Sequence, residues 1–365
     1  MRIVIAPDSF KGTAAAHVVA AAIADGWRQV RPDDELIEVP LADGGEGTID
    51  AFARAIPGAI RQRITVTDTD GFGSRTAEWL LLPDGTAVVE QAACGGLADL
   101  AALNPLGASS RGLGEAIRAA IEAGAARVLI GLGGSASNDG GAGLLQALGA
   151  GLLDEHGIPI EPGNAGLAHL VSIDAAGLID LPPGGVQVAV DVRNPMLGPE
   201  GAIAVFGPQK GVRPDQVAAM DGRLAGLARL LGVDPEVPGT GAGGGAAAAL
   251  LAWGAEIVPG SATIAEVAGL RSALAGADWV ITGEGSVDGQ TASGKVPALV
   301  ESWAREANVP LLIAAGRIAV PTPQARHAVA LLDLADGDVE RAMRHTTELL
   351  TRAGGELARA VSTGD

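Results

Sequence analysis

The sequence predicts an α/β protein of two domains, a Rossmann-like parallel-sheet domain built from both ends of the chain and a mixed-sheet α/β domain inserted between them. At 365 residues the chain can bury two separate cores. Short β-rich runs alternate with alanine-rich helical stretches near both ends, which is typical of a parallel sheet. We therefore place the first domain at 1–60 plus 262–365 and the second at 61–261. A plain division into an N-terminal and a C-terminal half is the alternative.

The N-terminal segment has the order strand, helix, strand, helix. The run IVIAPD from Ile3 predicts the first strand, and a helix is expected from about Thr13 to Val30. The run ELIEVP predicts a second strand, and a second helix is expected from Thr48. This order favours parallel pairing with a helical crossover.

From Arg61 to Glu90 the pattern changes to strand, turn and strand. Asp-Gly pairs at 70–71 and 84–85 are hairpin turn signals, so this part of the sheet is expected to be antiparallel. Helix and strand alternate again afterwards, with a helix near 114–123 and a strand at 128–132. The second domain is therefore predicted to hold a mixed sheet.

The rest of the chain continues in the same way. Further strands are expected in VQVAVDV, DWVITGEG, VPLLIAAG and HAVALLDL, and further helices near 214–231, 245–253 and 296–307. The segment Gly239–Trp253 is rich in glycine but ends in an apolar run. We interpret it as a glycine loop before a buried helix, with a flexible linker as the alternative.

Composition excludes several classes of function. The formal charge is −18, no basic run occurs, and nine aromatic residues offer few stacking surfaces, so nucleic acid is not an expected partner. No apolar stretch reaches the ~18 residues of a membrane span, and the N-terminus resembles a strand more than a secretion signal. We expect a cytoplasmic monomer or homodimer that acts on small molecules and has no membrane partner. Cys94 is the only cysteine, and its small neighbours favour packing over nucleophilic chemistry.

The three lysines stand in short glycine-bounded phrases. They are Lys11 in DSFKG, Lys210 in FGPQKG and Lys295 in TASGK, among 25 lysines and arginines in all. A lysine is a compact charge with three donors, which differs from the planar fork of arginine, so this placement points to anion binding.

Two polar phrases follow the first two predicted strands. In PDSFKG, Asp8, Ser9 and Lys11 precede a helix whose N-terminus offers free N–H groups to an anion; simple helix capping is the alternative. In LADGGEGT, Asp43 and Glu46 flank two glycines and suit Mg²⁺ or a substrate hydroxyl, unless they form only a turn.

The third phrase, GLGGSASNDGGAG, follows the strand that ends near Leu132. It departs from the dinucleotide-binding pattern but fits a loop that cradles phosphate, with a structural loop as the alternative. Its candidate cofactor-binding residues are Gly133, Gly134, Ser135, Asn138 and Asp139.

The fourth and fifth phrases carry further acids and lysines. Asp191 leaves a strand end, a good position for a base or metal ligand, and Asn194 and Lys210 follow within twenty residues, although an Asn-Pro turn and a solvated lysine would look the same. In ITGEGSVDGQTASGK, Glu284 and Asp288 precede Lys295. The ending resembles a P-loop, but Val296 replaces the hydroxyl residue that would hold Mg²⁺, so a true P-loop NTPase is rejected. The five histidines lie outside these loops, which makes a carboxylate the expected base.

Taken together and in this order, PDSFKG, LADGGEGT, GLGGSASNDGGAG, DVRNPMLGPEGA with FGPQKG, and ITGEGSVDGQTASGK resemble the type I glycerate kinase family. The resemblance implies ATP-dependent, Mg²⁺-dependent phosphorylation of D-glycerate, with 2-phospho-D-glycerate as the product associated with bacterial members. It also implies two α/β domains, one of them flavodoxin-like, with the active site in the cleft between them. A glycerate 3-kinase, or a non-catalytic regulator that binds nucleotide or acid, is the alternative.

The resemblance and the chemistry together suggest roles. Lys11 and Ser9, with Asp8, Asn194 and Lys210 as further substrate-binding candidates, would hold glycerate, and Asp43 or Asp191 would accept the hydroxyl proton. Asp191, Glu284 or Asp288 would hold Mg²⁺, and the Gly133–Gly143 loop with Lys295 would bind the nucleotide.

Overall fold

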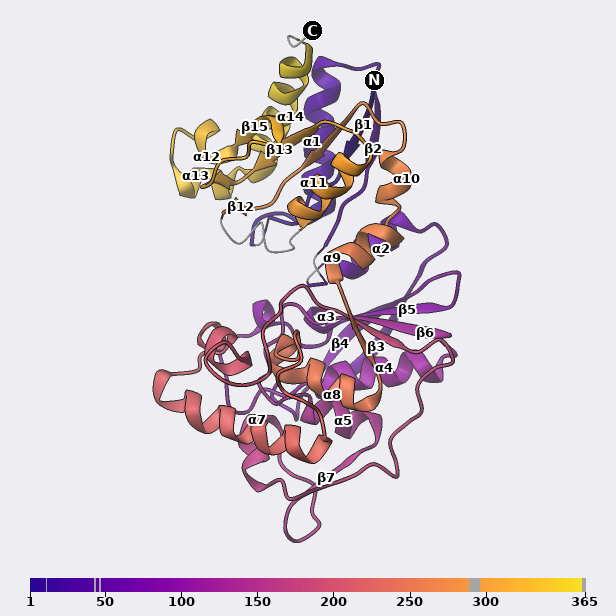
Figure 1. Cartoon of the computed structure of the whole chain (residues 1–365), viewed down its shortest axis with the longest axis vertical. Coiled ribbons are helices and arrows are strands. Elements are labelled where there is room, and N and C mark those ends of the chain that lie inside the picture. Colours follow the sequence, from indigo (N-terminus) through magenta and orange to yellow (C-terminus); the bar gives the residue numbers. More distant parts are fainter. Residues whose placement is uncertain (11, 43, 46, 289–295, 363–365) are drawn as a thin grey trace. The chain divides into compact units, whose positions relative to one another are not determined.

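A computed structural model describes residues 1–10, 12–42, 44–45, 47–288 and 296–362. The chain divides into two compact units (Figure 1). Unit 1 comprises Met1–Asp43, Asp50–Ile56 and Ser261–Asp365, and unit 2 comprises Gly44–Ile49 and Pro57–Gly260. Each unit has its own sheet, as expected for a two-domain α/β chain. The domain bounds drawn from the sequence stay a prediction.

Unit 1 is built on a parallel sheet to which both ends of the chain contribute. Its order is β15-β13-β11-β1-β2, and its pairings are all parallel. The strands are β1 (Arg2–Ile5), β2 (Glu35–Glu38), β11 (Trp279–Thr282), β13 (Leu311–Ala315) and β15 (Ala325–Ala330). The N-terminal strand therefore pairs with the next strand of the chain, β2, on one side and with β11 from the C-terminal part on the other, which confirms the predicted parallel sheet.

Apolar cores cover both faces of this sheet. Along β1, Ile3 and Ile5 belong to one core and Val4 to the other, as the alternation of side chains on a strand requires. The unit 1 helices are α1 (Ala16–Val30), α9 (Gly260–Val267), α10 (Leu270–Leu274), α11 (Val296–Glu306), α12 (Leu331–Leu334), α13 (Val339–Arg344) and α14 (Thr346–Ser362), with most of α2 (Thr48–Ala55). The helices α1 and α14 touch through glycine: a Cβ at Gly26 would lie 1.8 Å from the Thr351 carbonyl oxygen.

Unit 2 holds a six-stranded mixed sheet in the order β10-β9-β6-β5-β4-β3. The strands are β3 (Ile60–Thr67), β4 (Ser74–Leu81), β5 (Thr86–Glu90), β6 (Arg127–Gly131), β9 (Val186–Ala189) and β10 (Glu256–Val258). The first two pairings in the chain are antiparallel and the other three are parallel. Gly71 and Gly85 have φ of +81° and +84° in the two turns, a backbone conformation that favours glycine. The mixed sheet is confirmed.

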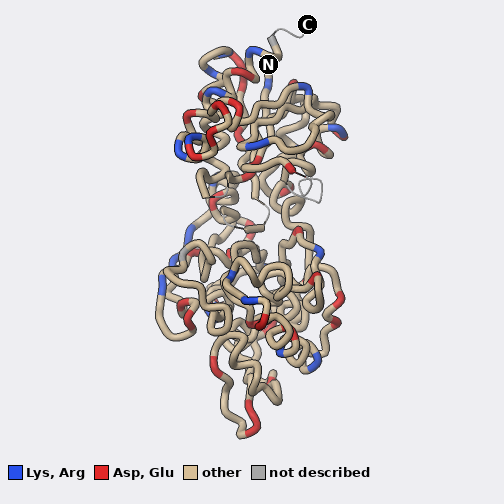
Figure 2. The backbone as a smooth tube through the Cα atoms, turned by 90° about the vertical axis from the view of Figure 1, so that its left-hand side faces the viewer, with Lys and Arg blue, Asp and Glu red and all other residues tan. Residues whose placement is uncertain are grey.

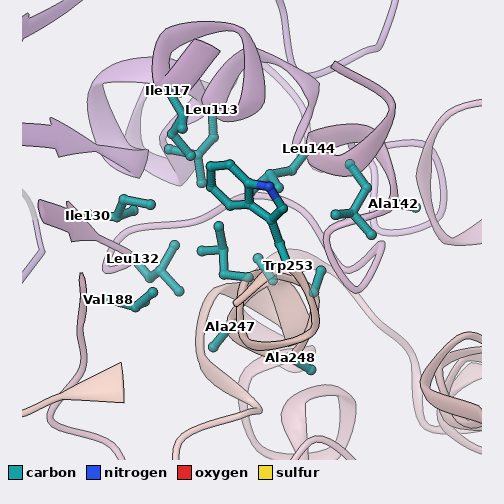
Figure 3. Close-up of a cluster of buried hydrophobic side chains, with 14 of the residues drawn as sticks. Leu113, Ile117, Ile130, Leu132, Ala142, Leu144, Val188, Ala247, Ala248 and Trp253 are labelled. Atoms are coloured by element: carbon teal, nitrogen blue, oxygen red, sulfur yellow. The ribbon is translucent and has the colours of Figure 1, made fainter. Parts of the chain in front are cut away.

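The core of unit 2 is dense in alanine and leucine (Figure 3). Trp253 is its largest labelled member in that view; its ring lies among side chains from several elements, and its indole N–H donates to the Ile179 carbonyl oxygen at 2.9 Å. The unit 2 helices include α3 (Gln91–Gly95), α4 (Arg111–Glu122), α5 (Ala142–Leu148), α6 (Gly163–Gly166), α7 (Val217–Leu231) and α8 (Ala246–Trp253). Most residues of helix α8 are buried, from Ala246 to Leu250 and at Trp253, so the glycines before it form a loop entering the core rather than a linker.

Some element bounds differ from the sequence predictions. The strand expected at 327–334 ends at Ala330, and Leu331–Leu334 form α12 instead. Leu331 and Ala335 are both buried, and this four-residue spacing suits a helix turning one face to the core.

Other expectations from composition concern single residues and the surface. Cys94 is buried, and desolvation raises the pKa of its thiol to about 12, as expected for a cysteine that packs in the core and is not a nucleophile. None of the helices in the described ranges is long and apolar enough to span a bilayer. Acidic and basic residues are interspersed along both units (Figure 2).

Candidate active site

Three neighbouring strands of unit 1 end at a common edge. Asp8 follows β1, Glu284 follows β11 and Gly316 follows β13. The Asp8 N–H donates to the Gly283 carbonyl at 2.8 Å, and the Gly316 N–H donates to the Glu284 carbonyl at 3.1 Å. A Cβ at Gly283 would lie 1.7 Å from the Ala314 carbonyl oxygen, so only glycine lets these strand ends approach so closely. Ligands of open α/β sheets bind at such an edge.

A pocket of about 490 Å³ opens at this edge. It is lined by Asp8, Ser9, Phe10, Thr13, Glu284, Gly285, Ser286, Asp288, Gly316, Arg317, Leu331, Leu332, Val339, Ala342, Met343 and Thr346. We call it the unit 1 pocket. Two short strands, β12 (Ser286–Val287) and β14 (Arg317–Ile318), pair in parallel and hold Ser286 beside Arg317. The pocket thus combines polar strand ends with an apolar side formed by α12 and α13.

The unit 1 pocket gathers four of the residues singled out in the sequence. Asp8 and Glu284 are only 6% and 7% exposed, whereas Ser9 and Asp288 are half-buried. The Ser9 N–H donates to Asp8 Oδ1 at 2.6 Å, and the Ser286 hydroxyl lies 3.5 Å from Asp288 Oδ2. Residues expected to bind substrate and residues expected to hold metal therefore line the same pocket. Lys11, Asp43 and Lys295 lie outside the described residues.

The glycine loop of unit 2 runs from β6 to α5, and most of it is buried. Gly134 is exposed and Gly133 half-buried, but Ser135, Asn138 and Asp139 are covered. A Cβ at Gly133 would lie 2.3 Å from the Gly45 Cα, so this part of the loop packs directly on backbone. The exposed part of this loop is therefore its start, at Gly134.

Asp139 is 0% exposed and organises the loop from inside. One carboxylate oxygen accepts hydrogen bonds from the Ser110 N–H at 2.8 Å, the Ser110 hydroxyl at 2.9 Å and the Gly143 N–H at 3.2 Å. The other oxygen accepts from the Gly141 N–H at 3.2 Å. These bonds satisfy free amides at the start of α5, the place where a negative charge is favourable. Asp139 thus caps a helix and ties it to Ser110.

Lys210 supports the same loop. Its side chain is buried, and its Nζ donates to the Ser137 carbonyl oxygen at 2.7 Å. Burial lowers the pKa of the Lys210 ammonium group from 10.5 to about 8, and the charge of Asp139 opposes part of that shift. The Lys210 side chain is thus buried inside unit 2, where it supports the loop, and is not exposed on the surface of the unit.

Asp191 and Asn194 follow β9. Asp191 is half-buried, and its Oδ1 accepts a hydrogen bond from the Gly260 N–H at 2.9 Å. The Asn194 side chain donates to the Glu200 carbonyl oxygen at 2.7 Å, which closes the loop between them. Both side chains remain partly accessible at a strand end.

Glu90 is a polar residue of this region that the sequence analysis did not identify. It ends β5 and is buried, and its two carboxylate oxygens accept from the N–H groups of Gly47 and Ile49, each at 3.0 Å. Glu90 therefore anchors Gly47 and Ile49, at the start of α2. The one sequence signal was a charged residue closing an otherwise apolar strand, TAVVE.

Within the described ranges, no three of the His, Cys, Asp and Glu side chains gather as a metal site. Mg²⁺ in phosphoryl-transfer enzymes is usually held by one or two carboxylates together with substrate phosphates. The carboxylates of the unit 1 pocket offer the hard oxygen ligands that such a cation prefers.

Two α/β units whose parallel strands end in carboxylates and glycine-rich loops have the architecture of α/β enzymes, a class that binds its ligands at strand ends. The model of the glycerate kinase family matches residues 3–362. The chain is 40% identical to the glycerate 2-kinase of Escherichia coli (strain K12), covering 100% of this chain and 99% of the relative. It is also 40% identical to the glycerate kinase of Bacillus subtilis (strain 168), over 99% of this chain and 98% of that one.

A solved structure agrees with these relatives. The crystal structure of a protein described as glycerate kinase 2 from Salmonella typhimurium LT2 superposes with a TM-score of 0.84 at 40% identity, covering 100% of this chain and 99% of that chain. This chain belongs to the glycerate kinase family, a family of phosphotransferases.

Proposed function

We propose that this protein transfers the γ-phosphoryl group of ATP to the 2-hydroxyl of D-glycerate, giving 2-phospho-D-glycerate and ADP. The observation that carries the proposal is the match over essentially the whole of both chains with a relative named glycerate 2-kinase. The carboxylates of the unit 1 pocket and the partly accessible Asp191 support it, because phosphoryl transfer needs chiefly positioning and charge stabilisation.

The proposed chemistry uses the acids, the serine and the lysine that follow the predicted strands. Lys11 and Ser9 hold the glycerate carboxylate, and Asp43 or Asp191 accepts the proton of the 2-hydroxyl as its oxygen bonds to the γ-phosphorus. The bond from the γ-phosphorus to the bridging oxygen breaks, and ADP leaves with that electron pair. Mg²⁺, held by Asp191, Glu284 or Asp288, would neutralise charge on the phosphates when bound.

In this proposal fewer residues of the glycine loop contact the nucleotide than its composition indicated. Exposed backbone at Gly134 meets the phosphates, because the Gly133 N–H already donates to the Gly44 carbonyl oxygen at 3.1 Å. The buried side chains of Asn138, Asp139 and Lys210 shape the loop. Backbone N–H groups at a strand-to-helix loop are suited to phosphate, so this division keeps the anion-binding role.

Phosphorus NMR of the product formed from D-glycerate and Mg-ATP tests the proposal. A 2-phosphoglycerate signal is expected. A 3-phosphoglycerate signal would keep the class of reaction and overturn the position, and absence of ADP would favour a protein that binds without catalysis.

The base is tested with Asp191→Asn, because asparagine retains an oxygen for the Gly260 N–H but loses the negative charge. We expect kcat to fall by at least about a hundredfold, the lower range for a general base. Asp234→Asn is the matched control, since Asp234 is also an unit 2 acid that accepts a backbone N–H, from Glu236. Near-normal turnover in Asp191→Asn would leave Asp43 as the proposed base.

A further inference from the structure

The unit 1 pocket has two sides of opposite character. One side consists of strand-end loops that present the carboxylates of Asp8, Glu284 and Asp288. The other consists of apolar side chains from α12 and α13, among them Leu332 and Met343. A ligand that fills such a pocket needs an apolar body and hydroxyl or amine groups at one end.

Helix α13 leaves large apolar side chains open beside this pocket. Val339 is 59% exposed and Met343 is 55% exposed, and they stand one helical turn apart, so they form one patch. Asp338 caps the helix by accepting the Arg341 N–H at 3.0 Å, which keeps this patch in place. Methionine is flexible and polarisable, and its sulfur packs well against aromatic rings.

The acid substrate alone does not account for this pocket. D-Glycerate is a small anion without an apolar face, while the pocket measures about 490 Å³ and has an apolar side as well as the charged groups of Arg317 and the carboxylates. Apolar side chains offer no hydrogen bonds to a carboxylate or a phosphate, so that side is left for another part of a ligand. The two sides instead match a flat heteroaromatic ring joined to a sugar.

We infer that the unit 1 pocket binds the nucleoside part of the phosphoryl donor. The base packs on the apolar side, against Met343 and Leu332, and the ribose hydroxyls donate to the carboxylate of Asp288 at a strand end, which leaves Asp191 or Glu284 as the proposed Mg²⁺ ligand. Acidic residues at the strand ends of dinucleotide-binding sheets take ribose hydroxyls in the same manner. The inference rests on the proposed function only in naming a nucleotide as the donor.

The test measures binding without turnover, by calorimetric titration of the full-length protein with adenosine, ADP and inorganic tripolyphosphate. Met343→Glu places a charge on the apolar side and should weaken adenosine and ADP binding by about tenfold or more, as loss of ~1.4 kcal/mol implies. Tripolyphosphate binding should stay unchanged. Val267→Glu is the matched control, because Val267 is a 39% exposed apolar residue of unit 1 that does not line the pocket.

The ribose contact has a test of its own. Asp288→Asn should weaken adenosine binding several-fold, roughly the worth of one charged hydrogen bond, and leave 2′,3′-dideoxyadenosine binding unaffected. Equal losses for both nucleosides would remove Asp288 from the ribose contact.

Two results would overturn the inference: unchanged adenosine affinity in Met343→Glu, or a rise in the KM of glycerate alone. Ala342→Trp, which fills the pocket, should reproduce the loss for adenosine. If the wild-type protein binds adenosine in a Met343-dependent way but phosphorylates no glycerate, the proposed function fails and the nucleoside pocket stands.

Discussion

The strand ends of the two units use the same residue type in opposite ways. In unit 1, Asp8 and Glu284 follow parallel strands and line a pocket. In unit 2, Asp139 also follows a parallel strand through a glycine loop, yet it is 0% exposed and accepts four hydrogen bonds within the unit. An acid after a strand is therefore lost to ligands where amides and a hydroxyl of the same unit use both of its oxygens, as at Asp139.

The difference comes from the distance along the chain to the next helix. Helix α5 begins at Ala142, with only two glycines between it and Asp139, so its free amides reach the carboxylate. Helix α1 begins at Ala16, well beyond Asp8 in the chain. The comparison predicts that unit 1 strand ends tolerate changes of side chain but not of backbone packing, whereas Asp139 cannot be changed without loss of stability.

The largest effect is expected from Gly283→Ala. The added Cβ would overlap the Ala314 carbonyl oxygen and force β11 from β13 at the edge that forms the unit 1 pocket. We expect a loss of more than about 4 kcal/mol in the free energy of unfolding, measured by urea denaturation, because backbone cannot yield as a side chain can. A loss below about 1 kcal/mol, typical of an unremarkable site, would refute the tight approach of these strands.

The next largest effect is expected from Asp139→Ala. Removing the carboxylate leaves Ser110 and the amides at the start of α5 without acceptors, which should cost about 3–4 kcal/mol in urea unfolding. Asp215→Ala removes an exposed acid of the same unit whose ion pair with Arg213 is solvated, and should leave the urea midpoint nearly unchanged. Equal losses in the two variants would contradict the architectural role of Asp139.

The lowered pKa of Lys210 predicts that the free energy of unfolding depends on pH. Its pKa is about 8 in the folded protein and 10.5 in the unfolded chain, so between these values the unfolded state binds more protons. Stability should therefore rise as the pH increases from about 8 to about 10.5, by on the order of 3 kcal/mol, and the burial cost is fully present below pH 8.

The readout for Lys210 is the difference in pH dependence between wild type and Lys210→Met, which cancels the titration of other groups. In Lys210→Met the free energy of unfolding should no longer rise over this pH range. If both proteins show the same slope in urea unfolding from pH 7.5 to 10, Lys210 is not the titrating group.

The smallest effect is expected from Gly222→Ala in α7. This glycine is exposed, has no neighbour within 4 Å of an added Cβ and needs no left-handed backbone. Alanine should stabilise the protein by about 0.5–1 kcal/mol, the usual helix-interior difference. A thermal midpoint below that of wild type would show that Gly222 has a packing role.

Much of the fold was predictable because its signals are local. The alternation of β-rich and alanine-rich stretches located β1, β11 and β13, and the Asp-Gly turns located the hairpins of unit 2. The predicted strand bounds were wrong where contacts with the core determine the conformation. At Leu331 the apolar run continues into a helix and does not extend the strand.

The sequence motifs of the candidate site could be predicted, but which of their residues face a pocket and which are buried could not. Asp8, Ser9, Glu284 and Asp288 line one pocket, as strand ends in one sheet suggest. Asn138, Asp139 and Lys210 carried the same sequence signals, yet they are buried inside unit 2. Their partners, such as Ser110 for Asp139 and Ser137 for Lys210, come from separate segments of the chain.

The sequence by itself determined the α/β class, the strand-end position of the polar phrases and the resemblance to glycerate kinases, because these depend on residue type and short spacing. Only the tertiary structure decided which acids face a pocket, that Glu90 holds Gly47 and Ile49 from a distant strand, and that an apolar helix face borders the carboxylates. Burial and hydrogen-bond partners are properties of segments brought together by folding, and no local pattern encodes them.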